Sequence, residues 1–209
     1  MNTEDSKSEK IRNHYESRIS DKRENYDILD WGDQAGQYAR FSVLVDNVSL
    51  SGRRILDLGC GLGDLWAYMK HRNIKAQYTG VDIVQPMIQR ASETHDDARF
   101  IAADVFAADC NALGDERFDI VFCSGMLNLD LGNNRSFLPV AIARMIELSR
   151  EYIVFNLLHI RAQPQYRHCV YHDPSDMLEM LCDFPGDIRV IDDYLPNDFT
   201  LIMRKCPQY

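Results

Sequence analysis

The segment that most constrains the fold is a short apolar run that ends in a glycine-rich turn. Residues 54–58 read Arg-Ile-Leu-Asp-Leu, and Gly59, Gly61 and Gly63 follow before a helix-compatible segment that starts at Asp64. Glycine permits positive φ and lets a ligand approach the backbone without a Cβ in the way. A strand, a tight turn and a helix in this order predict a ligand site at the carboxyl end of the strand.

The rest of the chain repeats this alternation of strand and helix. From residue 53 onward, short β-branched runs alternate with segments of helical period, which is typical of a largely parallel sheet with helices on both faces. Helices are expected over 65–70, 86–92 and 137–149, and another begins with Asp173 as its cap and Pro174 in its first turn. Seven strands are predicted in one sheet: residues 54–58, 77–82, 99–102, 118–123, 152–157, 188–192 and 199–204.

The connection between the last two strands predicts their direction. Residues 193–198 are too few for the crossover that parallel strands need, so these strands should form an antiparallel hairpin. The first 50 residues are different, because they are mostly helix-compatible, with aromatic side chains spread through a charged background. We therefore expect a helical extension over residues 1–50 that covers the active site, and one α/β domain over residues 51–209.

Composition excludes several functional classes. The formal net charge of −9 opposes the basic surface that nucleic-acid binding usually needs. No apolar run approaches the roughly 18 residues of a membrane span. The six cysteines contain no C-x-x-C pair, which favours reduced thiols over disulfides or a metal site. We expect a soluble, cytoplasmic protein without a metal; the sequence does not predict its oligomeric state.

The glycine spacing separates two classes of cofactor. The dinucleotide fingerprint G-x-G-x-x-G would need glycine at position 64, where this chain has Asp64. An aspartate in the first turn of the helix would repel a pyrophosphate. S-adenosylmethionine has no phosphate and carries a sulfonium cation, so Asp57 and Asp64 suit it. Each also has a structural interpretation: Asp57 can hold loop amides, and Asp64 can complement the helix dipole.

Two further acidic residues follow predicted strands. Asp82 ends the second strand about 20 residues after the glycine turn, where a carboxylate can accept both ribose hydroxyls. It could instead cap the helix that contains Pro86. Asp104 follows the third strand and can bind an adenine amine, with Val105 and Phe106 in apolar contact with the ring. The alternative for Asp104 is an exposed acid in a loop.

In combination and order, these pieces resemble the class I S-adenosylmethionine-dependent methyltransferases of the small bacterial type. The matching residues are 55–63, 80–82, 103–104 and 118–121, and the resemblance extends over positions 53–205. It implies a Rossmann-like, seven-stranded sheet with an antiparallel last strand, and S-adenosyl-L-methionine as the cofactor. The residues expected to bind that cofactor are Trp31, Arg40, Asp57, Gly59, Cys60, Gly61, Gly63, Asp82, Ile83, Asp104, Val105, Phe106 and Ser124.

The segment from Trp31 to Phe41 looks like the lead-in helix of a subgroup of these enzymes. The resemblance implies that a basic or aromatic residue there reaches the methionine end of the cofactor. We hypothesise that Arg40 pairs with the cofactor carboxylate. A solvated helix arginine is the alternative.

No residue is assigned as catalytic. Methyl transfer from a sulfonium is an in-line displacement on an activated electrophile, so the protein mainly has to align the reactants and exclude water. Residues 160–172 could form a lid over the substrate or a solvated loop. His159 could act as a base or be a hydrogen-bonded structural residue. The polar candidates for acceptor contact are Ser124, Asn128, Asn156 and His159, with His14 and Tyr15 from the N-terminal cover.

A small-molecule acceptor is expected. Enzymes that methylate exocyclic amines of DNA carry an Asn/Asp-Pro-Pro-aromatic segment after the fourth strand, whereas residues 123–126 here read Cys-Ser-Gly-Met. Two other functions stay open at this point. One is a catalytically inactive regulatory module that binds S-adenosylmethionine, because a fold alone does not establish turnover. The other is an NAD-dependent oxidoreductase with a Rossmann fold.

Overall fold

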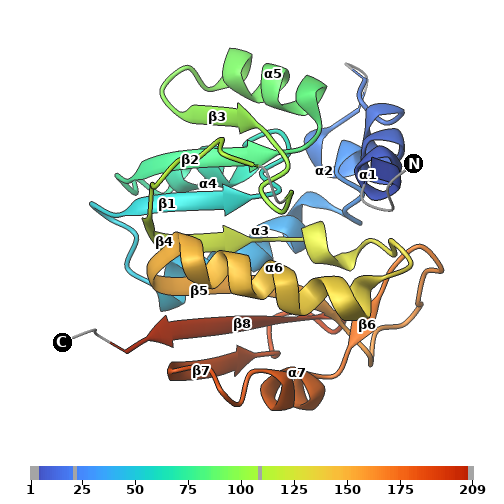
Figure 1. Ribbon diagram of the computed structural model, residues 1–209. Coiled ribbons are helices and arrows are strands. Elements are labelled where there is room, and N and C mark those ends of the chain that lie inside the picture. Colours follow the sequence, from blue (N-terminus) through green and yellow to red (C-terminus); the bar gives the residue numbers. More distant parts are fainter. Residues whose placement is uncertain (1–4, 21–22, 108–109, 207–209) are drawn as a thin grey trace.

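The computed structural model describes residues 5–20, 23–107 and 110–206, with side chains from residue 7 onward (Figure 1). Residues 1–4 and 21–22 of the expected extension lie outside the described residues. The strands within the described ranges are β1 Arg54–Leu58, β2 Gln77–Asp82, β3 Arg99–Ala102, β4 Phe118–Cys123, β5 Ser149–His159, β6 Tyr171–His172, β7 Gly186–Ile191 and β8 Asp198–Lys205.

The sheet has the expected mixed topology. Its strand order is β3-β2-β1-β4-β5-β8-β7, and β1 to β5 are parallel. β8 is antiparallel to both β5 and β7, which confirms the hairpin predicted from the short connection. The count differs from the prediction by one: β6 is a two-residue strand that pairs in parallel with the end of β5. A strand this short leaves no period-2 pattern in the sequence, so the prediction missed it.

The helices agree with the predictions in place: those predicted over 65–70 and 86–92 are longer at both ends, whereas the one predicted over 137–149 begins earlier, at Asn134, and ends at Leu148. Asp173 accepts a hydrogen bond from the Ser175 N–H at 2.8 Å and caps α7, as expected. Asp33 caps α3 in the same way, with a 2.6 Å bond from the Gly36 N–H. The described helices are α1 Asp5–Glu16, α2 Asn25–Ile28, α3 Gln34–Asn47, α4 Asp64–His71, α5 Gln85–Thr94, α6 Asn134–Leu148 and α7 Pro174–Met180, with a 3₁₀ turn, η1, over Met126–Asn128.

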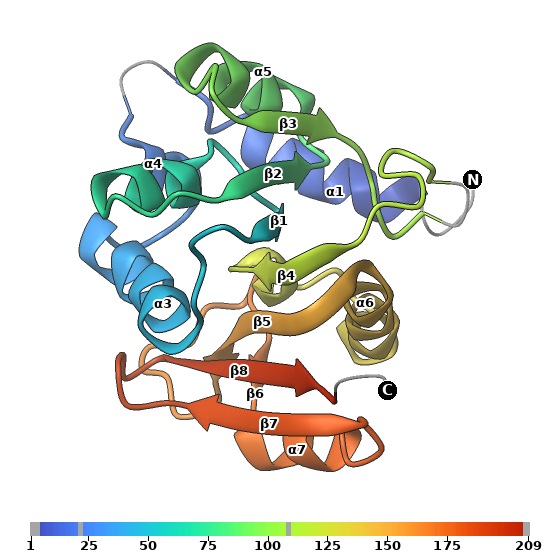
Figure 2. The ribbon, with the colours of Figure 1, turned by 90° about the vertical axis from the view of Figure 1, so that its left-hand side faces the viewer.

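Hydrophobic residues fill both faces of the sheet. Alternate residues of one strand point to opposite faces, so Ile55 packs against α3 and α4, whereas Leu56 and Leu58 pack against α6. Figure 2 shows α3 and α4 on one side of the sheet and α6 on the other. Helix α3 therefore belongs to the sheet's own layers, although its residues fall within the expected 1–50 extension.

The parallel strands end at one edge of the sheet, and the N-terminal helices lie at this edge. α1 lies beside the carboxyl ends of β1 and β2 in both ribbon views (Figures 1 and 2). Within the described residues, every helix is too short or too polar to span a membrane. The edge at which parallel strands end is where open α/β sheets bind ligands, so this fold places α1 over the expected site.

Candidate active site

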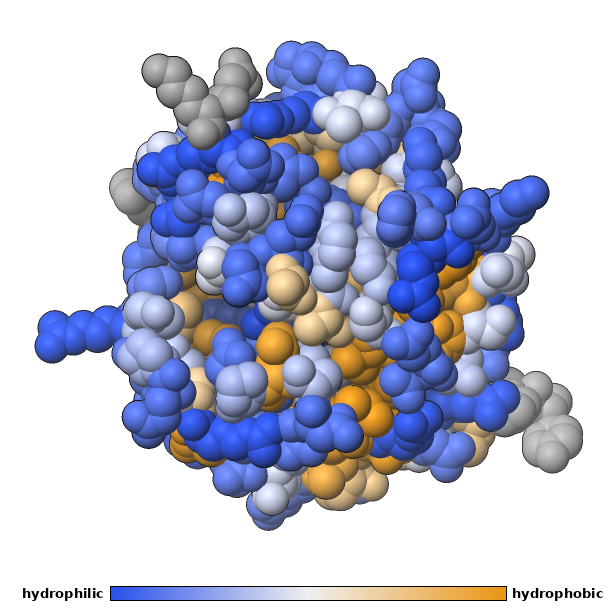
Figure 3. All heavy atoms as spheres, turned by 180° about the vertical axis from the view of Figure 1, so that it is seen from behind, coloured by the Kyte–Doolittle hydropathy of each residue, from blue (hydrophilic) through white to orange (hydrophobic). Residues whose placement is uncertain are grey.

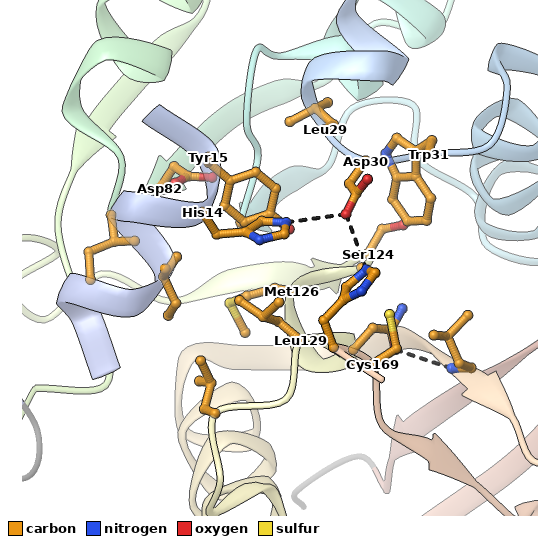
Figure 4. Close-up of a pocket in the computed structure, with 18 of the residues that line it drawn as sticks. His14, Tyr15, Leu29, Asp30, Trp31, Asp82, Ser124, Met126, Leu129 and Cys169 are labelled. Carbon is orange, nitrogen blue, oxygen red and sulfur yellow. Dashed lines mark hydrogen bonds and ion pairs between the residues drawn. The ribbon is translucent and has the colours of Figure 1, made fainter. Parts of the chain in front are cut away.

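A cavity of about 1660 Å³ lies at the carboxyl edge of the sheet. Its walls come from α1 and the segment before α3, from the ends of β1 to β4, and from residues 158–171 after β5. Figure 4 shows side chains from these three regions around one space. Figure 3 shows the back of the molecule, whose surface is mostly hydrophilic. Ligand pockets usually measure about 300–1,000 Å³. The cavity therefore has room for a nucleoside cofactor and a second small molecule.

The glycine turn has the predicted shape, but protein atoms explain two of its glycines. Gly61 has φ +53°, and a Cβ there would lie 2.5 Å from the Leu29 side chain. Gly63 has φ +80°, and its Cβ would lie 2.9 Å from both His95 and Phe100. Both residues lie outside the cavity wall, whereas Gly59 lies in it. The N-terminal segment thus packs directly on the turn, which local patterns could not reveal.

Asp57 is a buried acid at the end of β1 that lines the cavity. Its carboxylate accepts a 2.6 Å hydrogen bond from the Tyr78 hydroxyl. Burial raises the pKa of Asp57 to about 7, and the Tyr78 hydrogen bond opposes that shift. The negative charges of Asp82 and Asp64 raise it further. A cation in the cavity would favour the ionised form of this carboxyl.

Asp64 has a role that the sequence did not predict. Its two oxygens accept hydrogen bonds from Asn25 Nδ2 at 2.6 Å and from Gln37 Nε2 at 2.9 Å. Both partners belong to the N-terminal helices, so the carboxylate ties α2 and α3 to the start of α4. It lines the cavity as well, and its position in the first turn still suits the helix dipole.

Asp82 lies between the glycine turn and the segment that leads into α5. Its Oδ2 accepts from the Gly61 N–H and its Oδ1 from the Val84 N–H, each at 2.9 Å, so it braces the glycine turn. The interpretation of Asp82 as a helix cap is wrong, because the cap residue of α5 is Val84 and this cap has no side-chain hydrogen bond. It also lines the cavity, as does its neighbour Ile83. Burial raises the pKa of Asp82, and these backbone hydrogen bonds oppose the shift. Each carboxylate oxygen has a second lone pair for a ligand.

Only two of the three residues predicted for the adenine subsite after β3 line the cavity. Asp104 and Phe106 line the cavity. Asp104 accepts hydrogen bonds from the Phe106 N–H at 3.0 Å and from the Ser8 hydroxyl of α1 at 2.9 Å. The expectation for Val105 is wrong: its side chain is buried in the core on the α6 side of the sheet and does not line the cavity. Residues 104–107 form a turn, closed by a 3.2 Å hydrogen bond from the Ala107 N–H to the Asp104 carbonyl, and within this turn Val105 faces the core.

Arg40 is buried, not solvated, and it has a protein partner. Its Nε donates to Asp198 Oδ1 at 3.0 Å, Nη2 pairs with Asp198 Oδ2, and Nη1 donates to the Gly36 carbonyl at 2.7 Å. Its guanidinium carbon lies 4.3 Å from the ring centroid of Trp31. Both Arg40 and Trp31 line the cavity. The acid expected beside Arg40 was a cofactor carboxylate, whereas the structure places Asp198 there.

The polar acceptor candidates fall into two groups. Ser124 lines the cavity, and its Oγ is buried without a hydrogen-bond partner among the described residues. Asn128 also lines it, with its Oδ1 accepting from the Leu158 N–H at 3.1 Å. His159 lies outside the cavity wall, and its Nδ1 accepts from the Arg161 N–H at 3.2 Å. Its structural interpretation therefore holds. Asn156 is buried beneath the cavity and contacts Asp198.

A second set of charged residues escaped the sequence prediction. Asp30 lines the cavity with φ +63°, and its carboxylate lies 3.2 Å from His14 Nε2 and 3.4 Å from His168 Nε2. Arg18 lies 2.6 Å from the other oxygen. Figure 4 shows Asp30 between the two imidazoles. We call these four residues the entrance cluster. No local pattern linked them, although His14 was among the candidates for acceptor contact.

Cys60 and a group of apolar side chains complete the wall of the cavity. Cys60 is buried and lines the cavity. Burial raises the pKa of its thiol, so it is a neutral contact surface. No group of three or more potential metal ligands occurs among the described residues. The apolar part of the wall comes from η1, from the turn after β3 and from α6: Met126, Leu129, Leu131, Phe106, Phe137 and Val140.

Comparisons with known proteins agree with this geometry. Residues 49–182 match a family model described as a methyltransferase domain. A Mycobacterium tuberculosis protein, a methyltransferase by name, is 29% identical over 162 residues, which cover 72% of this chain and 92% of that protein. The trans-aconitate 2-methyltransferase of Delftia acidovorans is 29% identical over 127 residues, which cover 56% of this chain and 46% of that enzyme.

A solved structure shares the fold. Magnesium protoporphyrin IX methyltransferase from Synechocystis PCC 6803, crystallised with bound S-adenosylmethionine, superposes with a TM-score of 0.65 at 15% identity. The match covers 96% of this chain and 97% of that one. At this identity the likeness concerns the fold alone.

Proposed function

We propose that this chain, which belongs to the methyltransferase-domain family, transfers the methyl group of S-adenosylmethionine to a small-molecule acceptor. Its membership of this family sets the NAD-dependent oxidoreductase aside. One observation carries the proposal: Asp57, Asp82 and Asp104, which lie near the carboxyl ends of three adjacent parallel strands, line a single cavity with Gly59 and Cys60 of the glycine turn. The cofactor needs a partner for its sulfonium, its ribose and its adenine, and these acids supply one at each successive strand.

The cavity fits this cofactor in charge and in hydrogen-bonding capacity. Asp82 has lone pairs left for the ribose hydroxyls, and Asp104 has them for the adenine amine, with Phe106 as an apolar neighbour. The glycine turn and Arg40 lie at the methionine end. Asp57 is buried without a basic residue among the causes of its pKa shift, so a bound sulfonium would supply the missing positive charge.

The residues of the chain align and enclose the reactants. When bound, S-adenosylmethionine supplies a methyl group that its positive sulfur has already activated. α1 covers the cavity through the Ser8 to Asp104 hydrogen bond, and residues 158–171 close another side. Together they exclude water from the space that lies between the donor and acceptor sides. Ser124 lines this space, and its buried hydroxyl oxygen has no hydrogen-bond partner among the described residues.

The acceptor side favours a small, partly apolar molecule. Its wall combines Phe137 and Val140 of α6 with Met126 of η1. The net charge of −9 supports a free metabolite over a nucleic acid. One relative is named for trans-aconitate, a small molecule.

Two measurements test the proposal. Isothermal titration calorimetry should show binding of S-adenosylhomocysteine to the wild-type chain, and Asp82→Ala should weaken it by at least about tenfold, because the ribose hydroxyls lose their acceptor. An exposed aspartate on β7, Asp187, provides the control variant Asp187→Asn. Absence of binding to the wild type would overturn the proposal.

Turnover separates an enzyme from a regulatory module. Incubation with S-adenosylmethionine and a panel of small carboxylic acids, phenols and amines should release S-adenosylhomocysteine in at least one reaction. A protein that binds the cofactor yet never consumes it with a broad panel would be an inactive binding module, which is the alternative with the same fold.

A further inference from the structure

A buried polar network joins the last strand of the sheet to the N-terminal cover. Asp198, the first residue of β8, is fully buried, and its Oδ1 accepts from Arg40 Nε at 3.0 Å and from Asn156 Nδ2 at 2.7 Å. Its Oδ2 pairs with Arg40 Nη2. Arg40 and Asn156 are themselves only 5% and 1% exposed. The buried carboxylate thus has three hydrogen bonds to protein groups, which makes it a well-satisfied acid.

The network continues to the turn after β4. Asn156 Oδ1 accepts a 3.1 Å hydrogen bond from the N–H of Gly125, the residue that follows Ser124. Gly125 has φ +81°, and a Cβ there would lie 2.6 Å from the Trp31 ring. Because the Arg40 guanidinium carbon lies 4.3 Å from the centroid of the Trp31 ring, the contacts form a closed loop from Asp198 through Asn156, Gly125, Trp31 and Arg40 back to Asp198. Moving any one member would displace the Ser124 turn or the Arg40 guanidinium.

Arg40 keeps two donors for a ligand. A guanidinium has five N–H groups in a rigid plane. Three are used, by Asp198 twice and by the Gly36 carbonyl once. The other two, one on each terminal nitrogen, have no acceptor among the described residues, and Arg40 lines the cavity. Two donors on adjacent nitrogens of one planar group suit a carboxylate.

We propose that Asp198 and Asn156 are positioning residues for the amino-acid end of the cofactor. Asp198 holds the Arg40 fork with two donors free for the cofactor carboxylate, and Asn156 holds the Gly125 turn. This inference rests on the proposed function and deepens it. The desolvation of the guanidinium has already occurred on folding, so the ligand meets a pre-organised group. A merely structural network would hold the cover in place without distinguishing one ligand from another.

The experiment compares S-adenosylhomocysteine with its decarboxylated analogue, which lacks only the carboxylate. Calorimetry on the wild-type chain should give a preference of about tenfold to a hundredfold for the intact ligand, the effect of a charge-assisted bidentate contact. In Asp198→Asn this preference should fall by at least about fivefold, while binding of the analogue changes by less than about threefold. Asn156→Ala should lower the preference by a smaller factor, and Asp187→Asn should leave it unchanged.

Each outcome distinguishes positioning residues from residues that only hold the N-terminal cover in place. Equal losses for both ligands, or an unchanged preference in Asp198→Asn, would overturn the inference, as would a wild-type chain that ignores the carboxylate. If Asp198→Asn does not fold, the double variant Arg40→Met with Asp198→Leu removes both charges and leaves none unpaired. It should bind the two ligands equally; a retained preference would overturn the inference. Absence of S-adenosylhomocysteine binding to the wild type would instead reject the proposed function.

Discussion

Two aspartates fasten the N-terminal helices to the rest of the molecule, and they do so in opposite environments. Asp198 is fully buried and holds Arg40 and Asn156, whereas Asp30 is 30% exposed and lies beside His14 in the entrance cluster. In both cases the carboxylate contacts basic side chains from other parts of the chain. The comparison indicates that burial, more than the type of contact, determines whether a carboxylate and its basic partners hold a fixed geometry.

The environment changes the energetic balance of each pair. Charges that are buried without a partner are costly, so the buried pair must stay together once the chain has folded. The entrance cluster competes with water and with salt, and exposed pairs contribute little to stability. We infer that the buried network holds a fixed geometry, whereas the entrance cluster can open for a ligand to pass between α1 and residues 158–171.

The largest expected effect comes from breaking the buried side alone. Asp198→Ala leaves the Arg40 charge without its carboxylate and removes the acceptor of Asn156 Nδ2. The free energy of unfolding should fall by about 3–5 kcal/mol. Urea denaturation followed by circular dichroism measures it, with Asp30→Ala as the matched variant of the exposed side. A loss for Asp198→Ala no greater than for Asp30→Ala would contradict the comparison.

A second effect shows what burial does to an acid that has no basic partner. Burial raises the pKa of Asp57 to about 7, above its ordinary value of 3.8 in an unfolded chain. The folded protein therefore holds this proton more tightly, so the stabilisation is full below pH 3.8 and is lost as the pH rises through about 7.

Thermal and urea unfolding of the wild type and Asp57→Asn at several pH values tests this expectation. Between pH 5 and pH 8 the wild type should lose roughly 2–3 kcal/mol relative to the variant, whose amide does not titrate. Asp198, whose pKa burial also raises, titrates equally in both proteins and cancels in the difference. Parallel pH curves for the two proteins would show that Asp57 does not carry this proton.

The exposed side should give a smaller effect. Asp30→Ala removes the contacts of the carboxylate with His14, Arg18 and His168, which should cost less than about 1 kcal/mol in overall stability. Amide hydrogen exchange in α1 should accelerate by up to about fivefold, because this helix loses one of its attachments. Exchange in β8 should stay unchanged. Acceleration in both elements would mean that the two attachments unfold together.

The smallest effect is the dependence on salt. Raising the ionic strength to 1 M shortens the screening length to about 3 Å. The difference in stability between the wild type and Asp30→Ala should then shrink to a few tenths of a kcal/mol. The corresponding difference for Asp198→Ala should persist, because buried pairs are screened much less. Equal sensitivity of the two differences to salt would indicate that water reaches Asp198.

Local patterns predicted the elements well where a boundary residue was present. The bounds of β1 to β4 agree with the prediction, because each apolar run ends at a glycine, an acid or a polar turn. The cap of α7 was predicted from Asp173 and Pro174. By contrast β6 and the inward turn of Val105 were missed, since they depend on how residues 160–172 and the loop after β3 fold back on the sheet.

The sequence by itself determined the fold class, the antiparallel hairpin and the acids at the ends of three strands, because strand period, connection length and glycine turns are local properties. Only the tertiary structure decided which charges meet. Arg40 and Asp198 are 158 positions apart, and Asp64 bonds to Asn25 and Gln37 across the cover. Such pairs leave no periodic signal, since they form only when packing brings distant segments together and removes the water between them.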